Sequence, residues 1–425
     1  MALRHFFRNR DGSVAPMLAL AALPLFGFVG AAIDFSRAAS IRTSMQSAVD
    51  ASALMLSKSA PTLDPADLEQ KSSDAFKALF THPEAQNVQV AAVFNEPQQG
   101  NFSLTVTANA TVNTLFARLL GRPQIDLSAS SEVLWGIKRL NLALVLDNTG
   151  SMQQNAKMDN LKTAAHTLLT TLQNAAKKPD DIKVAIVPFS TDVNAGTENA
   201  GASWIDWTEW EAANGTCSND NYNSKSRCER NGKTWTPNAH STWNGCVYDR
   251  DQNNDVTNAA TVPGSPATLF RAHQASSCPV SMMPLSTDWT ALNTKIDAMT
   301  PTGNTNVTIG LAWGFQALSP VEPFNAPAPE TDLDKVMVIL TDGENTQNRW
   351  SSSATSIDAR TQKACDNIKA ANIKVYTVRV INGDVSLLKG CATKPTMYYD
   401  VQQADQLNGV FSSIAQNLAN LRITH

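Results

Sequence analysis

The hydrophobic pattern begins with an uncharged apolar run at residues 14–33, which Asp11 and Asp34 bound. A helix of about 20 residues spans roughly 30 Å, the thickness of a bilayer's hydrocarbon core. Three arginines precede the run within residues 1–13, and two follow it by residue 42. This asymmetry predicts one transmembrane anchor with a cytoplasmic tail at residues 1–13. A signal peptide cleaved near Ala32 is the alternative.

Residues 34–135 predict a helical stalk and a small α+β module. Residues 36–59 contain no Gly or Pro and prolong the first helix, and Asp64-Pro65 begins a second helix that runs to about Phe80. Apolar and polar residues then alternate in three segments, residues 88–94, 102–106 and 125–129. Period-two alternation predicts half-buried strands. Nothing in this module suggests chemistry.

The second half of the chain, residues 138–425, has a different pattern of apolar and polar residues. Helical stretches separate four short apolar runs, at residues 142–146, 184–187, 336–340 and 373–380. Alternating strands and helices predict an α/β fold with a doubly wound, mostly parallel, Rossmann-like sheet. A helix at residues 404–421 closes the domain.

An insertion at about residues 191–284 interrupts that alternation. It holds five of the nine tryptophans and four of the six cysteines, which a flexible linker would lack. We predict an inserted subdomain stapled by disulfides. Because the insertion follows a strand of the sheet directly, it should emerge at the carboxyl edge, where α/β folds bind ligands.

All six cysteines lie on the side of the anchor that the arginines predict to be translocated. In an oxidising compartment an even number of cysteines indicates disulfides. We expect Cys365 to pair with Cys391 across one helix and one strand, because the remaining four share the insertion. Among those four, short loops favour the pairs Cys217–Cys228 and Cys246–Cys278. Zinc held with His240 or His273 is the alternative, although no C-x₂-C spacing occurs.

Composition excludes several classes of protein. The net charge is −4 and only 17% of residues are charged, so the chain lacks the basic footprint of a nucleic-acid-binding protein. A mean hydropathy of −0.21 excludes a multi-pass membrane protein. No G-x-S-x-G and no histidine pair at metalloprotease spacing occurs. The sequence therefore predicts a binding protein rather than an enzyme.

Carboxylates and hydroxyls follow two of the buried strands. One strand runs into Asp147, Thr149 and Ser151, the other into Asp342, and the loop before an intervening helix supplies Thr305. In a doubly wound sheet these loops share one edge. All five side chains offer hard oxygen ligands, which suit Mg²⁺, with Mn²⁺ or Ca²⁺ as alternatives.

This pattern resembles the metal-ion-dependent adhesion site (MIDAS) of von Willebrand factor A (VWA) domains, with Thr149 in place of the family's first serine. The resemblance implies direct metal ligation by Thr149, Ser151 and, in the ligand-bound form, Thr305, with Asp147 and Asp342 acting mainly through water. It also implies that a partner's carboxylate completes the metal's coordination. A nucleophilic aspartate of the haloacid dehalogenase class would need a second aspartate at the position of Thr149.

The N-terminal segment resembles a second family. Residues 10–14, 30–34 and 46–54 around the apolar run are similar to the TadG-like start of Flp/Tad pilus-assembly proteins. That resemblance implies a bacterial inner-membrane protein with a single pass, a cytoplasmic N-terminus and a periplasmic C-terminal domain. The implied partner of the metal face is a pilus subunit, an assembly component or a surface receptor.

Two function classes compete with a metal-dependent binding protein. One is a structural stalk of the cell envelope whose VWA domain uses no metal. The other, an intracellular VWA protein that aids cofactor insertion, conflicts with the anchor and the cysteines.

Two further patterns have plain structural interpretations. Asp249, Asp251, Asn253 and Asp255 copy alternate positions of a calcium loop, but the loop lacks its glycine and its final glutamate, which favours a solvated turn. Tryptophans 204, 207 and 210 suggest either the core of a small stapled unit or an exposed recognition surface.

Overall fold

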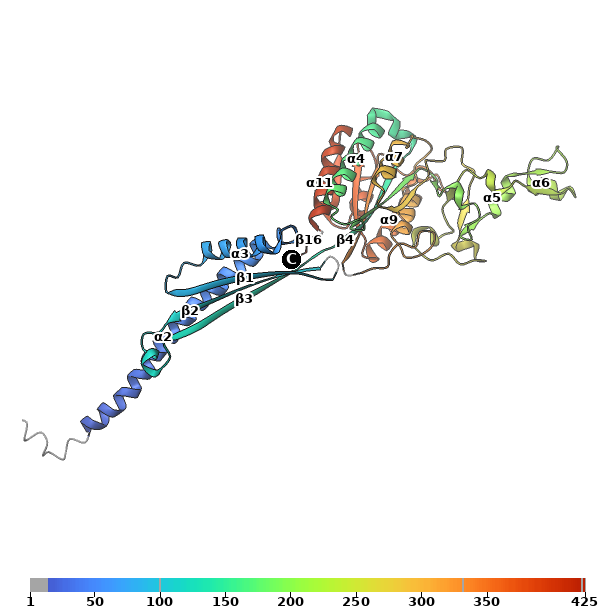
Figure 1. Cartoon of the computed structure of the whole chain (residues 1–425). Coiled ribbons are helices and arrows are strands. Elements are labelled where there is room, and N and C mark those ends of the chain that lie inside the picture. The colour runs from blue at the N-terminus through green and yellow to red at the C-terminus, as the bar shows by residue number, and fades with distance from the viewer. Residues whose placement is uncertain (1–13, 99–100, 331, 422, 425) are drawn as a thin grey trace, which may run out of the picture. The chain divides into compact units, whose positions relative to one another are not determined.

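The computed structural model describes residues 14–98, 101–330, 332–421 and 423–424. The expected cytoplasmic tail at residues 1–13 lies outside these residues. The chain divides into two compact units, residues up to Ile137 together with Thr424, and Lys138–Ile423. We describe each unit by itself (Figure 1).

The N-terminal unit packs two helices on an antiparallel sheet. Its elements are α2 (Val14–Leu56), α3 (Pro65–Leu79), β1 (Ala85–Gln98), β2 (Asn101–Asn113) and β3 (Gln124–Ile137), with the two-residue β16 (Ile423–Thr424) beside β3. Asp64 caps α3 by accepting a hydrogen bond from the Asp67 amide. Every second residue of β2 from Leu104 to Val112 is buried against the helices, as the alternating pattern predicts.

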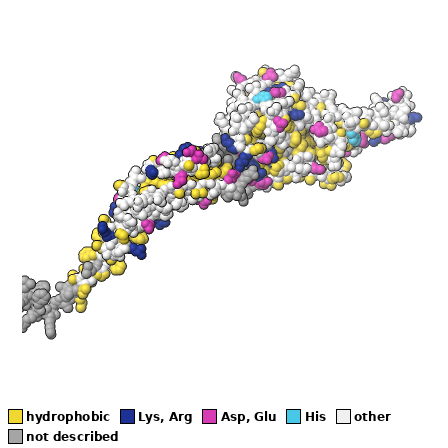
Figure 2. All heavy atoms as spheres, in the orientation of Figure 1, with side chains coloured by type: hydrophobic (Ala, Val, Ile, Leu, Met, Phe, Trp, Pro, Cys, Tyr) yellow, Lys and Arg dark blue, Asp and Glu magenta, His cyan; other side chains and the backbone are white. Residues whose placement is uncertain are grey.

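The helix α2 has two different halves. Its C-terminal half carries Ile41, Met45 and Val49, which are buried in the core with β2. Its N-terminal half exposes large apolar side chains, which Figure 2 shows in yellow: Met17, Leu18, Leu20, Leu25, Phe26, Phe28, Val29, Ile33 and Phe35. Among the described residues one helix, at Met17–Leu56, is long and apolar enough to cross a membrane. By length and composition it fits either an anchor or a signal sequence.

The C-terminal unit is an α/β fold with a mostly parallel central sheet. Its main strands are β4 (Arg139–Asp147), β5 (Ile182–Phe189), β13 (Leu333–Thr341), β14 (Lys374–Val380) and β15 (Tyr398–Val401), in the parallel order β15-β14-β13-β4-β5. The short β12 (Met283–Ser286) pairs antiparallel with β5. The predicted doubly wound sheet is confirmed.

Helices cover both faces of this sheet (Figure 1). One face packs against α4 (Lys157–Ala175), α7 (Trp289–Asp297) and α11 (Leu407–Leu421), and the other against α8 (Val307–Ala317) and α9 (Ala354–Ala370). The remaining helix is α10 (Val385–Cys391). Glycine permits the close approach of α8, since a Cβ on Gly314 would lie 2.5 Å from Val145. The close packing of α8 places the loop before it, which contains Thr305, next to the carboxyl end of β4.

Most of the insertion extends the sheet, and a small separate core remains around the Cys217–Cys228 disulfide and Trp235. Strands β6 (Val193–Asn194), β10 (Cys246–Tyr248), β11 (Phe270–Ala272) and β7 (Ile205–Asp206) continue outward from β5 in that order. Trp204 and Trp210 are buried in the same core as α8 and the central strands. This core corrects the interpretation of the tryptophans as the centre of an independent unit, and it excludes an exposed recognition surface for these two.

Three disulfides join the pairs favoured from the sequence. Cys246–Cys278 lies within the insertion, and Cys365–Cys391 links α9 to the end of α10. Cys217–Cys228 links the ribbon of β8 (Gly215–Cys217) and β9 (Trp235–Pro237) to α6 (Lys225–Arg230), beyond α5 (Thr208–Ala213). Disulfide bonding of all six cysteines contradicts the zinc alternative.

Short 3₁₀ helices connect these elements. They are η1 (Ala60–Thr62), η2 (Ala117–Leu120), η3 (Gly150–Ala156), η4 (Thr197–Asn199), η5 (His240–Thr242), η6 (Asn254–Val256), η7 (Pro266–Thr268), η8 (Pro395–Met397) and η9 (Ala404–Gln406).

Candidate metal centre

The candidate site lies where the adjacent parallel strands β4 and β13 end. Their register pairs Leu146 with Leu340, so Asp147 comes beside Thr341. The Asp147 carboxylate is completely buried, and its Oδ2 accepts a 2.7 Å hydrogen bond from the Thr341 hydroxyl. Asp342 follows at once, and its amide approaches the same oxygen at 3.4 Å. The two aspartates are thus brought together by neighbouring strands, as the sheet pattern predicts.

A chain of oxygen atoms runs from Asp147 to Asp342 through the first loop. The Thr149 amide and hydroxyl donate to Asp147 Oδ1 at 2.8 and 2.6 Å. Thr149 Oγ1 lies 3.0 Å from Ser151 Oγ, and the Ser151 hydroxyl donates to Asp342 Oδ1 at 2.6 Å. Four of the five predicted ligand side chains therefore form one continuous polar cluster.

Backbone contacts hold the loop that precedes α8 against the first loop. The Gly150 amide donates to the Gly303 carbonyl at 3.0 Å, and the Thr302 amide donates to the Asn148 carbonyl at 2.7 Å. Gly303 has a φ of +77°, a left-handed conformation that glycine adopts without strain. The Thr305 amide donates to the Thr346 hydroxyl at 2.9 Å, which fixes the backbone and leaves the Thr305 side chain beside the strand ends.

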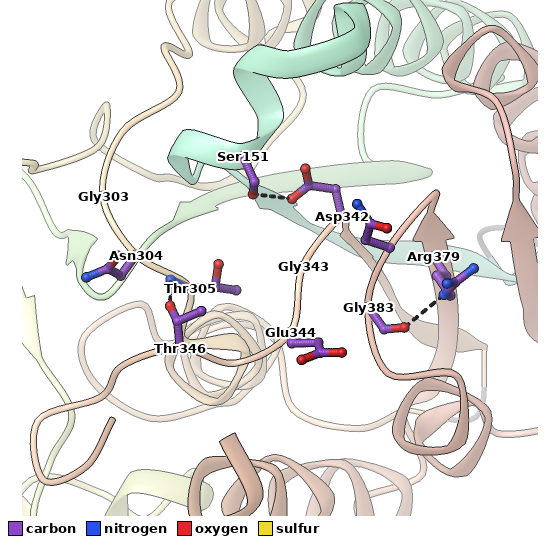
Figure 3. Close-up of a pocket in the computed structure, with 11 residues that line it drawn as sticks. Ser151, Gly303, Asn304, Thr305, Asp342, Gly343, Glu344, Thr346, Arg379 and Gly383 are labelled. Carbon is purple, nitrogen blue, oxygen red and sulfur yellow. Dashed lines mark hydrogen bonds between the residues drawn. The ribbon is translucent and has the colours of Figure 1, made fainter. Parts of the chain in front are cut away.

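The fifth predicted ligand, Thr305, meets the others around Gly343. A Cβ placed on Gly343 would lie 3.3 Å from Thr305 Oγ1 and 3.8 Å from Ser151 Oγ. Glycine at this position therefore leaves space between the two hydroxyls. Figure 3 shows that Ser151, Thr305 and Asp342 come from three loops around one pocket. The pocket encloses about 490 Å³, and its lining also includes Asn304, Glu344, Thr346, Arg379, Asn382 and Gly383.

A buried lysine supplies the positive charge at this site. The Lys157 ammonium, at the start of α4, donates a 2.7 Å hydrogen bond to Asp342 Oδ2. Burial and the neighbouring Asp342 raise the pKa of Asp147 to about 6, although hydrogen bonds from Thr149 and Thr341 lower it. Two adjacent carboxylates with one ammonium leave a net negative charge, which a bound cation would compensate.

Neither Lys157 nor Thr341 was identified from the sequence as a site residue. A lysine at a helix start normally points to solvent, and its partner lies 185 residues away in the chain. Thr341 directly precedes Asp342, so its position at the end of a buried run was the available signal.

The residues present fit a hard divalent cation. Hydroxyl and carboxylate oxygens are the ligand type that Mg²⁺, Mn²⁺ and Ca²⁺ prefer. Ser151, Thr305 and Asp342 line the pocket, whereas Asp147 and Thr149 lie buried directly behind them. Within the described part of the chain, no group of three or more His, Cys, Asp or Glu side chains is arranged to hold a metal ion. A metal ion at this site would therefore need the hydroxyls of Thr149, Ser151 and Thr305 as ligands in addition to the two carboxylates.

Two family models match the amino-acid sequence. Residues 12–55 match the putative Flp pilus-assembly TadE/G-like family, and residues 253–413 match the von Willebrand factor type A domain. The C-terminal unit therefore contains a VWA domain match. The VWA match begins at residue 253, so the strand that carries Asp147 lies outside it. In the structure this strand, β4, lies between β5 and β13 in the same sheet, although α4, β5 and most of the insertion separate it in sequence from the matched part.

Several solved structures are distantly similar. The pilus adhesin SpaC from Lactobacillus rhamnosus GG is 14% identical, with a TM-score of 0.38, over 81% of this chain and 36% of SpaC. The von Willebrand factor domain of the type V pili tip protein Mfa5 from Porphyromonas gingivalis is 12% identical, with a TM-score of 0.39, over 68% of this chain and 97% of that domain.

Proximal thread matrix protein 1 from the mussel byssus, with a zinc-occupied MIDAS motif, is 13% identical, with a TM-score of 0.34, over 67% of this chain and 46% of that chain. This chain thus spans about a third to a half of the length of SpaC and the byssus protein. Likenesses this distant decide neither activity nor partner. No curated protein matches the sequence.

The calcium-like loop is not the solvated turn expected from its sequence. Asp249 is buried, and its carboxylate accepts hydrogen bonds of 3.1 and 3.0 Å from the side-chain amide Nδ2 of Asn306, the residue after Thr305. Asp255 is also buried and pairs with the Arg360 guanidinium of α9. The sequence could not reveal these partners, because they lie 57 and 105 residues away. The loop therefore serves to fasten the insertion to the loop before α8 and to α9.

The histidines of the insertion have other partners than a metal. His240 stacks on Trp207 with ring centroids 3.7 Å apart, and its Nε2 lies 2.9 Å from Glu211. His273 stacks on Tyr248 at 3.4 Å and contacts Asp192 through Nδ1.

Proposed function

We propose that this chain is a membrane-anchored, metal-dependent protein-binding component of a bacterial Tad/Flp-type pilus-assembly or adhesion system. The observation that carries the proposal is the convergence of Ser151, Thr305 and Asp342 on an open pocket around Gly343. The TadE/G-like match at residues 12–55 and the VWA match at residues 253–413 support the pilus context and the binding role.

The proposed metal is Mg²⁺, with Mn²⁺ and Ca²⁺ as the other candidates. Thr149 and Ser151 would hold it directly, Thr305 would join them in the ligand-bound form, and Asp147 and Asp342 would act mainly through water. Because the direct ligands are neutral hydroxyls, the bound cation would keep enough positive charge to attract a carboxylate from a partner protein. Arg379 also lines the pocket, but its guanidinium pairs with Asp400 at 2.7 Å and donates to the Gly383 carbonyl at 2.9 Å, so the proposed attraction depends on the metal. The partner would be a pilus subunit, an assembly component or a surface receptor.

The decisive test is Mg²⁺ binding by calorimetry to the full chain and to two variants at Thr305. Thr305→Val has almost the same shape but no hydroxyl, and Thr305→Ser retains the hydroxyl. The backbone of Thr305 makes the contacts that hold the loop, so both variants should fold. We expect Thr305→Val to weaken Mg²⁺ binding at least tenfold and Thr305→Ser to bind within about threefold of the original chain. Absence of Mg²⁺ binding to the full chain would overturn the metal assignment, and equal affinity in all three proteins would overturn the role of the Thr305 hydroxyl.

Partner binding is tested by co-purification from envelope extracts with and without a chelator. A protein that is retained by the full chain, and lost both with chelator and in Thr305→Val, supports the proposal. Partners that remain in both cases would favour a structural stalk that uses no metal.

We place the proposed anchor in the inner membrane, with a cytoplasmic N-terminus and a periplasmic VWA domain. The exposed apolar half of α2 supports the anchor, and the excess of arginines before the apolar run supports a cytoplasmic N-terminus. A reporter enzyme that is active only in the periplasm, fused after His425, should be active in membranes. Activity found solely with a cytoplasmic reporter would reverse the topology, and release of the fusion from membranes would indicate cleavage of the segment.

A further inference from the structure

The connection between β2 and β3 exposes an unusual number of apolar side chains. We call residues 115–121 the β2–β3 tip. Its four large apolar residues, Leu115, Phe116, Leu119 and Leu120, are 61%, 42%, 82% and 63% exposed. A tight connection between antiparallel strands needs no such residues, since turns favour Gly, Pro, Asn, Asp and Ser. An exposed apolar cluster commonly marks a contact surface.

Hydrogen bonds fix the tip to α2 at the end of the apolar run. The Asp34 carboxylate accepts hydrogen bonds from three successive amides, those of Leu115 at 2.9 Å, Phe116 at 2.7 Å and Ala117 at 2.7 Å. Only 4% of Asp34 is exposed, so these bonds are protected from water. The tip therefore has a defined position along α2.

Two glycines of α2 show where that position is. A Cβ on Gly30 would lie 2.5 Å from the Phe116 side chain, and a Cβ on Gly27 would lie 4.0 Å from Leu120. The tip thus runs along α2 from Asp34 back toward Gly27, into the half of the helix that exposes its apolar side chains (Figure 1).

The rise per residue of an α-helix gives the depth in the bilayer at which these contacts would lie. At 1.5 Å per residue, Gly30 lies about 4.5 Å and Gly27 about 9 Å before Ile33, the last residue of the apolar run. If the run spans a bilayer, Phe116 and Leu120 lie at those depths below its edge. Amphipathic segments that rest in a membrane interface bury their apolar residues by about 5–10 Å, so the tip reaches the boundary between headgroups and acyl chains.

The charges of the tip suit the same environment. Arg118 and Arg122 are exposed, and no acidic residue occurs between Thr114 and Pro123. Arginine can extend its guanidinium to lipid phosphates while its alkyl stem stays among apolar groups. A protein partner or a second copy of the chain could also cover an apolar cluster. A bilayer is favoured because Phe116 and Leu120 lie against Gly30 and Gly27, within the apolar run whose large side chains are exposed.

We propose that the β2–β3 tip is a second membrane-contact site, which inserts Phe116, Leu119 and Leu120 into the leaflet at the C-terminal end of the apolar run. This inference rests on the membrane anchoring proposed above. A helix alone leaves a protein free to rotate and tilt about one attachment. The tip adds a second attachment in the same unit, which fixes how the β-sheet of the N-terminal unit leaves the membrane.

The test is lipid-phase quenching of a fluorophore on the full chain in vesicles of phosphatidylethanolamine and phosphatidylglycerol. All six native cysteines are paired, so one added cysteine provides a unique site for an NBD label. Leu119→Cys labels the tip. Phe28→Cys labels the exposed face of α2, and Val262→Cys labels an exposed apolar residue of the VWA domain as the control. The quencher is a phospholipid with a nitroxide near the top of its acyl chain.

We expect strong quenching at Leu119→Cys and Phe28→Cys, and less than a tenth of that quenching at Val262→Cys. Quenching at position 28 without quenching at position 119 would overturn the tip proposal and leave the anchor intact. A blue-shifted but unquenched label at position 119 would likewise overturn it, since protein would then cover the tip. Absence of quenching at both positions would reject the anchor itself, and the tip proposal with it.

Discussion

The Lys157 ammonium lies 2.7 Å from the Asp342 carboxylate, and the two side chains are only 2% and 0% exposed. This ion pair joins the start of α4 to the end of β13 at the base of the candidate metal centre. A buried carboxylate that loses its partner remains charged in a medium that solvates it poorly. The Lys157 ammonium therefore supplies a positive charge against the Asp342 carboxylate, next to Asp147.

Replacement of Lys157 should make the VWA domain dependent on divalent cation. Lys157→Met retains the length of the side chain and removes its charge, so we expect a loss of about 3–5 kcal/mol in unfolding free energy without Mg²⁺. Saturating Mg²⁺ should raise the melting temperature of this variant more than that of the original chain, because the metal replaces the lost positive charge.

Lys162→Met on the same helix is the control for that substitution. Its ammonium contacts a backbone carbonyl at the helix surface, so a change within about 0.5 kcal/mol is expected. Calorimetry in detergent measures both variants. Equal destabilisation by the two substitutions would show that the Lys157–Asp342 pair has no special role.

Asp249 should make stability fall as pH rises. Burial raises the pKa of Asp249 to about 7, although hydrogen bonds from Asn306 and the Arg349 amide lower it, and an unfolded aspartate has a pKa of about 4. The folded state then holds this proton more tightly. The contribution to stability is complete below about pH 4 and is lost as pH rises through about 7.

Asp249→Asn cannot ionise, so the loss of melting temperature between pH 5 and pH 8 should be smaller in this variant than in the original chain. Asp251→Asn is the matched control. Partial burial raises the pKa of Asp251, but hydrogen bonds from Arg271 and Arg349 outweigh it and hold that pKa below its usual value. The stabilising effect of Asp251 is therefore lost only at lower pH, and its substitution should leave the difference between pH 5 and pH 8 unchanged. An unaltered pH dependence in Asp249→Asn would contradict the assignment.

The sequence predicts those features that depend on the order of strands and helices along the chain. Short apolar runs between helices predict a parallel sheet, and parallel strands must bring Asp147 and Asp342 to one edge. The same reasoning does not reach partners that only tertiary packing selects. Asp255 and Arg360 form a buried ion pair across 105 residues, yet in sequence Asp255 belongs to a polar run that predicts a solvated turn. The burial of Lys157 was missed for the same reason.

The disulfides should differ in what they stabilise. Cys365 and Cys391 are both buried in the core of the VWA domain and close a loop of 26 residues. Replacing both by alanine should lower the unfolding free energy by about 3–4 kcal/mol, mainly by freeing the unfolded chain. Scanning calorimetry of the VWA transition measures the change.

Cys217 and Cys228 belong instead to a small separate cluster with Trp235. Replacing this pair by alanine should leave the VWA melting temperature nearly unchanged and raise amide hydrogen exchange in residues 215–237. A larger fall in melting temperature on replacing Cys217 and Cys228 than on replacing Cys365 and Cys391 would contradict this assignment of the two disulfides to a separate cluster and to the main core.

The final prediction concerns the two glycines that face the β2–β3 tip. Alanine should favour the helix by about 1 kcal/mol at either position, so helix propensity cancels when the two variants are compared. The added methyl of Gly30→Ala would lie 2.5 Å from the Cβ and Cγ of Phe116, too close for the tip to keep its place, whereas that of Gly27→Ala makes an ordinary contact of 4.0 Å. Gly30→Ala should therefore displace the tip and weaken the hydrogen bonds to Asp34. In detergent, tryptic cleavage after Arg118, followed by mass spectrometry, should become several times faster in Gly30→Ala and stay unchanged in Gly27→Ala. Equal cleavage rates in both variants would mean that Phe116 is not held against α2 at Gly30.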